Sequence, residues 1–389
     1  ELLRAHVSSA YKTALWLRSK GHEWVPSYNN PTTGNVVMLN GGGYQFQQHN
    51  FAYLKRQNVP IHCETAAMRL VLDSEGRVVG VHAVQPSTTL TALAKTTVLA
   101  SGGFESNPEM RARYLGRNWD KVKMKGVPFN TGDGLRMALD IGAMPYGSWT
   151  SCHGSPQDLN RPWYTLPSSQ TISGREWNRF AFPYGIMVNV HGERFIDEAA
   201  DVRAKIYGTM GPIIIEQPQG VAFQIFDAKA RKLGLLVDYD KATGAKDNTL
   251  TGLALKLGVD PKGLDNTVQL FNSAVGTGLA DPNPFHKDGK STIGIVPPKS
   301  NFAMSIEEPP YEGYAVCGGI TFTYGGLKID PKTAQVQHVG GWAIPGLYAA
   351  GNIVGGLWYS GYVSGSALMA AAVFGRIAGE HAARRAIEG

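Results

Sequence analysis

Cysteine is scarce in this chain of 389 residues, and its few cysteines follow no ligand or disulfide pattern. Cys63, Cys152 and Cys317 lie far apart and form no CxxC or CxxH spacing. This argues against a structural zinc site and against a disulfide framework, and it suits a reducing compartment. The chain also lacks an uninterrupted apolar run of about 18 residues, so we expect no membrane span. These absences favour a cytoplasmic protein without a metal site.

Blocks of one charge are absent as well. The formal net charge is +6, and the basic residues are spread along the chain. A nucleic-acid-binding surface usually needs clustered Lys and Arg, so we expect no nucleic-acid partner. The sequence has no low-complexity tract and no repeat with a period of about 20–50 residues. Its length instead suggests two or three globular domains.

The dinucleotide-binding fingerprint GxGxxG is missing too, together with the acidic residue expected about 20 positions beyond it. The chain opens with "ELLRAHVSSAYKTALWLRSKG", which predicts an amphipathic helix that starts without Met and ends at Gly21. We therefore expect that residues encoded upstream of Glu1 carry the missing segment.

The elements that are present alternate between strands and helices. A glycine-rich turn at 41–43 precedes a predicted helix, and 60–73 with 78–84 predict a hairpin. The segment "KTTVLASGG" predicts a fully buried strand, and Pro108 lies in the first turn of the next helix. From about residue 145 to 310, Trp, Pro and Tyr become dense and periodicity weakens, after which the earlier pattern returns. The sequence thus predicts an α/β domain interrupted by an inserted domain.

Three glycine loops share one design, in which a buried strand ends in glycines and a helix or tight turn begins. They occupy residues 98–106, 130–137 and 347–368. Such loops expose backbone N–H groups beside helix N-termini, where phosphates or an anionic ring carbonyl can bind. In open α/β sheets they gather at the carboxyl ends of the strands. We expect them to form one ligand site, although tight turns with close packing would also explain each loop singly.

The last loop leads into a long helix that starts near Ser366. Its first nine positions are almost free of polar residues, so we expect it to be buried at its start. Ser364, Gly365 and Ser366 form a predicted N-cap region with free donors. Such a helix N-terminus would stabilise negative charge on a bound ring system.

Four motifs in order resemble the fumarate reductase/succinate dehydrogenase-type flavoprotein family. They are "TVLASGGFESNPEM", "NTGDGLRMALDIGA", "NVHGERFIDE" and "IPGLYAAGNIVGG" with "SGSALMAAAVFGRIAGE". "GERFIDE" and "ITFTYGG" are most similar to the tricarballylate dehydrogenase-like branch. The resemblance implies FAD as the cofactor and a Rossmann-type FAD-binding domain with an inserted capping domain. We expect the FAD-binding domain at 1–145 and 313–389, and the capping domain at 146–312.

The resemblance also implies which residues contact FAD. Ala67 matches the residue whose backbone contacts the adenine ring. Asp133 matches the aspartate of the "TGDG" motif, and Asn352 replaces the family's usual Glu. Ser101 replaces the usual Thr of the glycine turn. The implied cofactor-binding residues are Ala67, Ala100, Ser101, Gly102, Asp133, Asn352, Ser366, Ala367 and Leu368.

The same resemblance implies three catalytic residues. His153 lies at the entry to the cap, Arg203 follows "GERFIDE" as a proton donor, and Tyr362 lies in the last glycine loop. We expect Arg203 and Tyr362 to meet, with the cation lowering the pKa of the phenol. The alternatives are a capping role for His153 and a pairing of Arg203 with Glu198 or Asp201.

Two cationic anchors of the family are replaced, by Phe322 with Thr323 and by Tyr362. A larger and less charged substrate than fumarate is therefore expected. The predicted function is an FAD-dependent oxidoreductase that moves a hydride between flavin N5 and a carbon–carbon bond of a small molecule. A separate electron-transfer partner is possible in this scheme. The alternatives are a flavin monooxygenase acting on a tetrapyrrole precursor and a truncated, non-catalytic chain.

Overall fold

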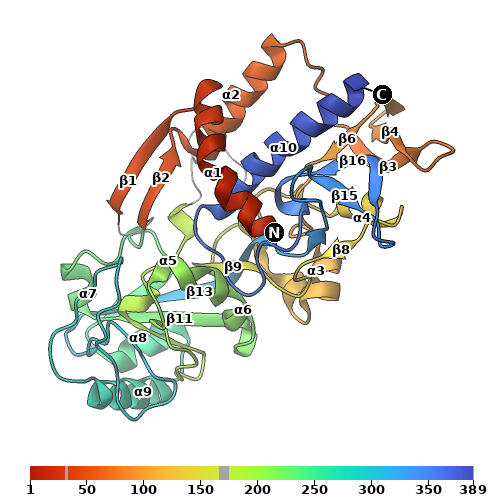
Figure 1. Cartoon of the computed structure of the whole chain (residues 1–389). Helices are drawn as coiled ribbons and strands as arrows, with labels where there is room; N and C mark the ends of the chain where they lie inside the picture. Colours follow the sequence, from red (N-terminus) through yellow and green to blue (C-terminus); the bar gives the residue numbers. More distant parts are fainter. Residues whose placement is uncertain (31–33, 166–174, 389) are drawn as a thin grey trace.

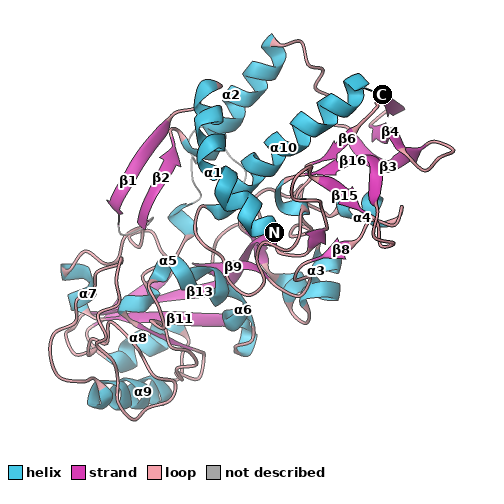
Figure 2. Ribbon diagram, in the orientation of Figure 1, coloured by secondary structure: helices cyan, strands magenta, loops and turns pink. Residues whose placement is uncertain are grey.

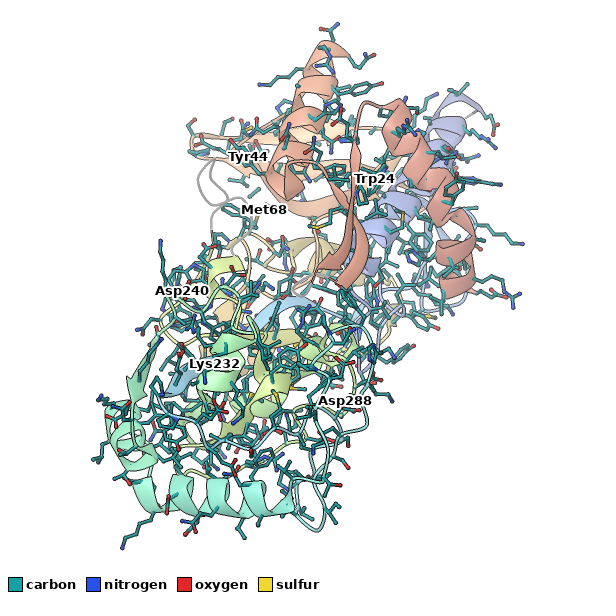
Figure 3. The ribbon with its side chains drawn as sticks, turned by 90° about the vertical axis from the view of Figure 1, so that its left-hand side faces the viewer. Trp24, Tyr44, Met68, Lys232, Asp240 and Asp288 are labelled. Atoms are coloured by element: carbon teal, nitrogen blue, oxygen red, sulfur yellow. The ribbon has the colours of Figure 1, made fainter. Side chains whose placement is uncertain are left out.

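Two bodies make up this computed structural model, which describes residues 1–30, 34–165 and 175–388. One body holds the long helices α1, α2 and α10 with several small sheets, and the other holds α5 to α9 around a larger sheet (Figures 1 and 2). Side chains fill both bodies; Trp24 and Met68 lie in the first, and Lys232 and Asp288 in the second (Figure 3). The fold mixes helix and strand, as the sequence predicts.

The first body contains helices and short sheets from both ends of the chain. Its helices are α1 (Leu2–Ser19), α2 (Gly42–Arg56), α3 (Pro108–Leu115), α4 (Asp133–Leu139) and α10 (Ser366–Glu388). Its strands are β1 (Trp24–Asn30), β2 (Gly34–Leu39), β3 (Ala66–Leu72), β4 (Val78–Gln85), β5 (Thr88–Leu93), β6 (Thr97–Leu99), β8 (Pro145–Tyr146), β14 (Gly326–Leu327), β15 (Gln335–Gln337) and β16 (Ala343–Ala349).

The second body is built on a six-stranded sheet. Its strands are β7 (Lys123–Met124), β9 (Cys152–Asp158), β10 (Ile186–Val188), β11 (Val221–Phe226), β12 (Gly244–Asp247) and β13 (Tyr311–Thr323). Its helices are α5 (Arg203–Ile206), α6 (Met210–Ile215), α7 (Ala228–Lys232), α8 (Leu250–Leu257) and α9 (Pro261–Ala274). The long strand β13 pairs with β11, β12, β9 and β7 and organises this sheet.

The domain limits stay a prediction, but β13 shows how the chain returns from one body to the other. The strand spans Tyr311–Thr323 and so runs across the predicted limit at 312–313. Directly after its end, the segment "TYGG" leads the chain back into the first body, where β14 pairs antiparallel with β8.

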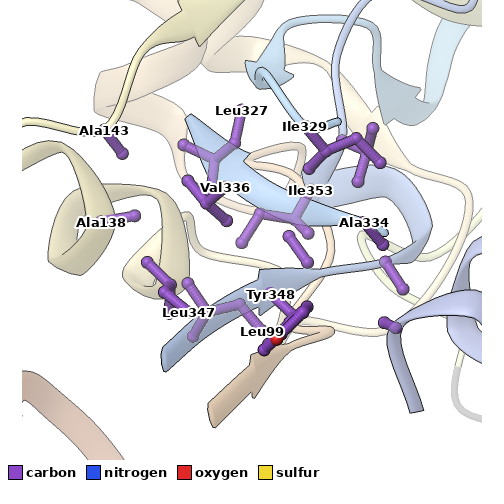
Figure 4. Close-up of a cluster of buried hydrophobic side chains, with 14 of the residues drawn as sticks. Leu99, Ala138, Ala143, Leu327, Ile329, Ala334, Val336, Leu347, Tyr348 and Ile353 are labelled. Atoms are coloured by element: carbon purple, nitrogen blue, oxygen red, sulfur yellow. The ribbon is translucent and has the colours of Figure 1, made fainter. Parts of the chain in front are cut away.

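The core of the first body joins distant parts of the sequence. Strand β16 pairs in parallel with β6, and Leu347 lies opposite Thr97 in the register. Figure 4 shows Leu99, Ala138, Leu347 and Ile353 in one cluster of buried side chains. Burial of such side chains from four segments holds the strand ends in one place.

One of the sequence-based expectations about this body is wrong in detail, and two others are confirmed. Val98 is 41% exposed, because β6 is an edge strand of its three-stranded sheet rather than a fully buried strand. Helix α1 forms as predicted, but it packs against α10 with Leu17 buried, while Val7 and Tyr11 are exposed. The predicted hairpin is confirmed as β3 and β4, which pair antiparallel.

Candidate active site

The three glycine loops meet at the ends of β6 and β16, as the sequence predicts. The backbone N–H of Ala350 donates to the carbonyl of Leu99 over 3.0 Å, which ties the first loop to the last. A Cβ added at Gly134 would clash with Ser101 Oγ and would lie 3.1 Å from Ile353 Cδ1. Residues of all three loops are therefore in contact around Gly134.

The predicted cofactor residues of the first and last loops lie at this junction. Ala100 and Ser101 are exposed, and Gly102 adopts φ +77°, a left-handed conformation that favours glycine. A Cβ at Gly102 would come within 3.0 Å of the Asn130 side chain. Asn352 is half-buried in the turn after β16. In this turn Gly102 packs closely against Asn130, whereas Ala100 and Ser101 stay exposed.

Asp133 and Ala67 lie on neighbouring elements beside this junction. Asp133 is exposed at the start of α4, where its carboxylate accepts a hydrogen bond from Thr131 Oγ1. Helix α4 packs on β3, and the Arg136 guanidinium donates to the carbonyl of Met68 over 3.2 Å. Ala67, next to Met68, is half-buried. Asp133 and Ala67 thus lie on two elements that pack against each other, and neither side chain is fully buried.

The start of α10 differs from the expectation of a buried N-terminus with free donors. Leu368 is 45% exposed, and Ser366 and Ala367 are half-buried. The N–H of Ser366 donates to the carbonyl of Val363 over 3.1 Å, and the N–H of Ala367 donates to the Tyr362 hydroxyl over 3.4 Å. The preceding loop folds back over the helix end, so the chain itself uses these two donors.

A cavity of about 420 Å³ lies between the start of α10 and the second body. One wall comes from β1, β2 and α2, a second from the start of α10, and a third from α5 and the segments before η3 (Phe182–Tyr184) and after β7. Its lining includes Trp24, Val36, Val37, Met38, Leu39, Gly42, Gly43, Lys125, Asn178, Phe180, Arg203, Ala204, Tyr207, Val237, Asp238, Ser364, Gly365, Leu368 and Met369. Arg203 and Leu368 are thus the two predicted site residues in this wall.

Arg203 is the first residue of α5 and is buried, with 6% of its surface exposed. Its guanidinium carbon lies 5.5 Å from the centre of the Phe180 ring. Burial lowers the pKa of Arg203, and the nearby phenols of Tyr184, Tyr207 and Tyr239 oppose this shift.

The acidic residues considered as partners of Arg203 pair with other cations. Glu198 lies 2.7 Å from Arg194 and 3.7 Å from Lys299, and Asp201 lies 3.3 Å from Lys205. These ion pairs hold the loop that carries "GERFIDE". The guanidinium of Arg203 itself lies beside the Phe180 ring in the cavity wall.

His153 and Tyr362 belong to one cluster of aromatic side chains, which Tyr207 connects to the cavity wall. The His153 ring lies 4.7 Å from the ring of Tyr362 and 5.1 Å from that of Tyr207, both edge to face, and it stacks on Phe322 at 5.4 Å. Tyr207 also contacts Phe180 at 5.2 Å, so it links this cluster to the cavity wall. The structure therefore brings His153 and Tyr362 together, with Tyr207 between Tyr362 and Arg203.

Burial is the largest cause of the pKa shifts of His153, Tyr207 and Tyr362. The pKa of His153 falls to about 3, because burial and the charge of Lys125 disfavour the imidazolium. Burial raises the pKa of Tyr207 to about 12 and also raises that of Tyr362. The expectation of a lowered pKa for Tyr362 is wrong in direction, because burial of the phenol raises its pKa and the hydrogen bonds at the start of α10 only partly oppose this shift.

The residues around the cavity and the cluster fit a flavin. In the described part of the chain, His153 Nδ1 and Nε2, Tyr324 Oη and Trp149 Nε1 are buried without a hydrogen-bond partner. A bound polar ring system could satisfy groups of this kind. Gly365 adopts φ +84° with open space where a Cβ would be, at the edge of the cavity. A cavity of this size is also within the range of small-molecule sites.

Lys125, Phe180 and Tyr207 are among the wall residues that the sequence does not identify. Lys125 was one of many dispersed cations, and Phe180 belonged to an aromatic-rich insert without periodicity. Tyr207 follows Arg203 by four positions, and this spacing could have placed the two side chains on one face of a helical turn.

The sequence predicts neither a metal site nor a membrane span, and two features of residues 1–30, 34–165 and 175–388 bear on these expectations. Within these ranges no cluster of three or more His, Cys, Asp or Glu could hold a metal ion. None of the helices described there combines the length and the apolarity that crossing a bilayer requires. Cys63, Cys152 and Cys317 all have free thiols.

Comparison with known proteins identifies the family. The family model for an FAD binding domain matches residues 38–368. The chain is 32% identical to the NADH:acrylate oxidoreductase of Vibrio harveyi, over 98% of this chain and 37% of that protein. It is 31% identical to a probable fumarate reductase of Shewanella frigidimarina, over 86% of this chain and 52% of that protein. The chain thus spans about half or less of the length of these two relatives.

Among solved structures, the open conformation of a flavocytochrome c3 fumarate reductase superposes with a TM-score of 0.72 at 26% identity, covering 99% of this chain and 64% of that one. The motifs of the sequence, the convergence of the glycine loops and the shared fold agree with one another. The chain therefore belongs to the FAD binding domain family, with FAD as its cofactor, and it is similar to flavoproteins of the fumarate reductase type.

Proposed function

We propose that the protein is an FAD-dependent oxidoreductase that adds or removes a hydride and a proton across a carbon–carbon bond of a small organic molecule. One observation carries the proposal: Arg203 lies in the wall of a cavity that is also lined by Gly365 and Leu368 at the start of α10. A proton source and the predicted flavin segment thus face the same space. Relatives named as acrylate and fumarate reductases support this reaction type.

FAD, when bound beside the start of α10, supplies the hydride that one alkene carbon receives. Arg203 donates a proton from its guanidinium to the other alkene carbon. Burial lowers the pKa of Arg203, which makes the guanidinium a better acid than an exposed arginine. In the reverse direction the same group accepts the proton.

His153 and Tyr362 serve to position this donor and the helix start. The Tyr362 hydroxyl accepts from Ala367 N–H, and its ring contacts His153. Tyr207, which hydrogen-bonds to Ser364 and contacts Phe180, connects that arrangement to the wall that carries Arg203. A neutral His153 suits this packing role, because its pKa of about 3 keeps the ring uncharged near pH 7.

The alternative of a monooxygenase receives less support, because the relatives reported above are named for reduction of a double bond. The proposal also includes a separate electron-transfer partner and a cytoplasmic location.

Anaerobic rapid mixing tests the proposed function. The full-length flavoprotein is reduced with dithionite and mixed with acrylate, fumarate or cinnamate while the flavin band near 450 nm is followed. We expect at least one of these alkenes to reoxidise the flavin and to yield the saturated acid. In D₂O both former alkene carbons should carry solvent deuterium, because the N–H of the reduced flavin exchanges with solvent before transfer. If no alkene reoxidises the flavin under these conditions, and a parallel experiment in air-saturated buffer yields a hydroxylated product, the monooxygenase is favoured instead.

A further inference from the structure

The charges of the cavity wall are few and unevenly placed. Among the wall residues that the structure describes, Lys125, Arg203 and Asp238 are charged, and most of the others are hydrocarbon or aromatic. Because an ionised group is costly to place against hydrocarbon without a partner of opposite charge, these three side chains influence which ionised groups a substrate can carry.

Lys125 and Arg203 flank one aromatic ring. Lys125 Nζ lies 5.2 Å and the Arg203 guanidinium carbon 5.5 Å from the centre of Phe180. Both cations thus belong to the same part of the wall. Since the proposed reaction uses Arg203 at the alkene carbon, Lys125 is the cation that can hold an anionic group next to it.

The backbone holds Lys125 and Phe180 firmly in these positions. Lys125 follows β7, which pairs in parallel with β13, and its N–H donates to the carbonyl of Ile320 over 2.6 Å. Arg179, the neighbour of Phe180, is fully buried and its guanidinium lies 2.7 Å from Asp158. Preorganised positions of this kind suit recognition rather than a solvated surface charge.

Asp238 adds a negative charge on the same cavity. The residue is exposed and adopts φ +66°, and its backbone carbonyl accepts from Arg179 over 3.1 Å. A second carboxylate on the substrate would meet this like charge or the apolar wall. Either environment disfavours a dianion.

We propose that Lys125 binds the single carboxylate of a monocarboxylic 2-enoate with an apolar body, and that Asp238 selects against dicarboxylates. The inference rests on the proposed function, which supplies the alkene and assigns the proton to Arg203. It adds a substrate class and two specificity-determining residues. The apolar body lies against Phe180 and the hydrocarbon side chains of β2 and α10.

Binding of saturated acids tests this assignment without turnover. The full-length holoprotein is titrated by calorimetry with 3-phenylpropanoate, with the neutral 3-phenylpropanamide and with succinate. Lys125→Gln should raise the Kd of 3-phenylpropanoate about tenfold or more and leave that of the amide within about twofold. Lys125→Arg should keep the affinity for the acid within about threefold, because it preserves the charge. Lys121→Gln, which removes an exposed lysine outside this cavity, is the matched control and should change neither Kd.

Asp238→Asn gives the complementary measurement. Asn tolerates the left-handed backbone conformation, and the variant keeps the carbonyl that Arg179 contacts. We expect succinate to bind about threefold tighter or more, with 3-phenylpropanoate less affected. Equal losses for acid and amide in Lys125→Gln, an equal loss in Lys125→Arg, or tighter binding of succinate than of 3-phenylpropanoate by the unaltered protein would overturn the proposal.

The two proposals fail in different ways. If 3-phenylpropanoate binds through Lys125 but no alkene reoxidises the flavin, the proposed function is wrong while the anion site stands. If fumarate is reduced with a higher kcat/KM than cinnamate, the proposed function stands and the substrate class is wrong.

Discussion

The rings of His153 and Tyr362 meet edge to face, with their centroids 4.7 Å apart. His153 belongs to β9 of the six-stranded sheet, and Tyr362 lies in the loop that leads into α10. A Cβ added at Gly208 would lie 3.0 Å from His153 Cδ2 and 3.6 Å from Tyr362 Cβ, so η4 (Tyr207–Thr209) packs closely against both. The contact therefore joins the two bodies at the candidate site.

The first prediction concerns whether Arg203 of the second body or Tyr362 of the first body supplies the proton. Arg203→Lys should lower kcat about 10²-fold or more, because the shorter ammonium no longer places its donor at the alkene carbon. Tyr362→Phe should lower kcat less than about tenfold, since the raised pKa and the contact with Ala367 favour a positioning role. Steady-state rates with a flavin spectrum recorded for each variant make the comparison. A greater loss in Tyr362→Phe would reassign the donor to the phenol.

The second prediction follows from the pKa of His153, which is about 3 in the folded protein and 6.5 ordinarily. Between these values the unfolded chain binds a proton that the native protein does not bind, so stability falls as the pH falls through this window. His153→Phe removes this dependence. From pH 7 to pH 4.5 the variant should lose about 2 kcal/mol less free energy of unfolding than the unaltered protein.

Urea unfolding at the two pH values measures this difference. Parallel losses in His153→Phe and in the unaltered protein would mean that His153 titrates normally.

The sequence predicts the parts of the site that local patterns encode. The strand ends, the glycine turns and the helix start follow from short motifs such as "SGG" and "TGDG", and the structure brings them together at Gly134. It could not place Lys125 beside Phe180, because that contact depends on the pairing of β7 with β13 and on the packing around Arg179. Nor could it show that the N–H of Ala367 faces the Tyr362 hydroxyl, which is a matter of loop conformation.

The third prediction tests Asp133 as a contact of FAD. Asp133→Ala should weaken FAD binding by the full-length protein by about 1–3 kcal/mol, if a hydroxyl of the cofactor is left without its acceptor. The melting temperature of the FAD-free protein should change little, because the side chain is exposed. Asp140→Ala, on an exposed residue at the other end of α4, is the matched control. Unchanged FAD affinity together with a lower melting temperature would give Asp133 a structural role.

The last prediction concerns a buried carboxyl beside the first glycine turn. Glu105 is fully buried, and its Oε1 accepts from Asn130 Nδ2 over 2.6 Å. Its Oε2 lies 3.5 Å from Thr323 Oγ1 at the end of β13. Desolvation raises the pKa of Glu105 from 4.5 to about 7, although these hydrogen bonds oppose the shift.

The sign of the effect on stability is opposite to that of His153. Between pH 4.5 and about 7 the unfolded chain releases a proton that the native protein retains, so this group destabilises the fold increasingly as the pH rises. Glu105→Gln keeps the shape and an acceptor for Asn130 but cannot ionise. Relative to the unaltered protein, its free energy of unfolding should rise by about 1–3 kcal/mol from pH 4.5 to pH 8, measured by urea unfolding of the FAD-free protein. A Glu105→Gln variant whose free energy of unfolding differs from that of the unaltered protein by the same amount at both pH values would show that Glu105 titrates alike in the native and the unfolded chain.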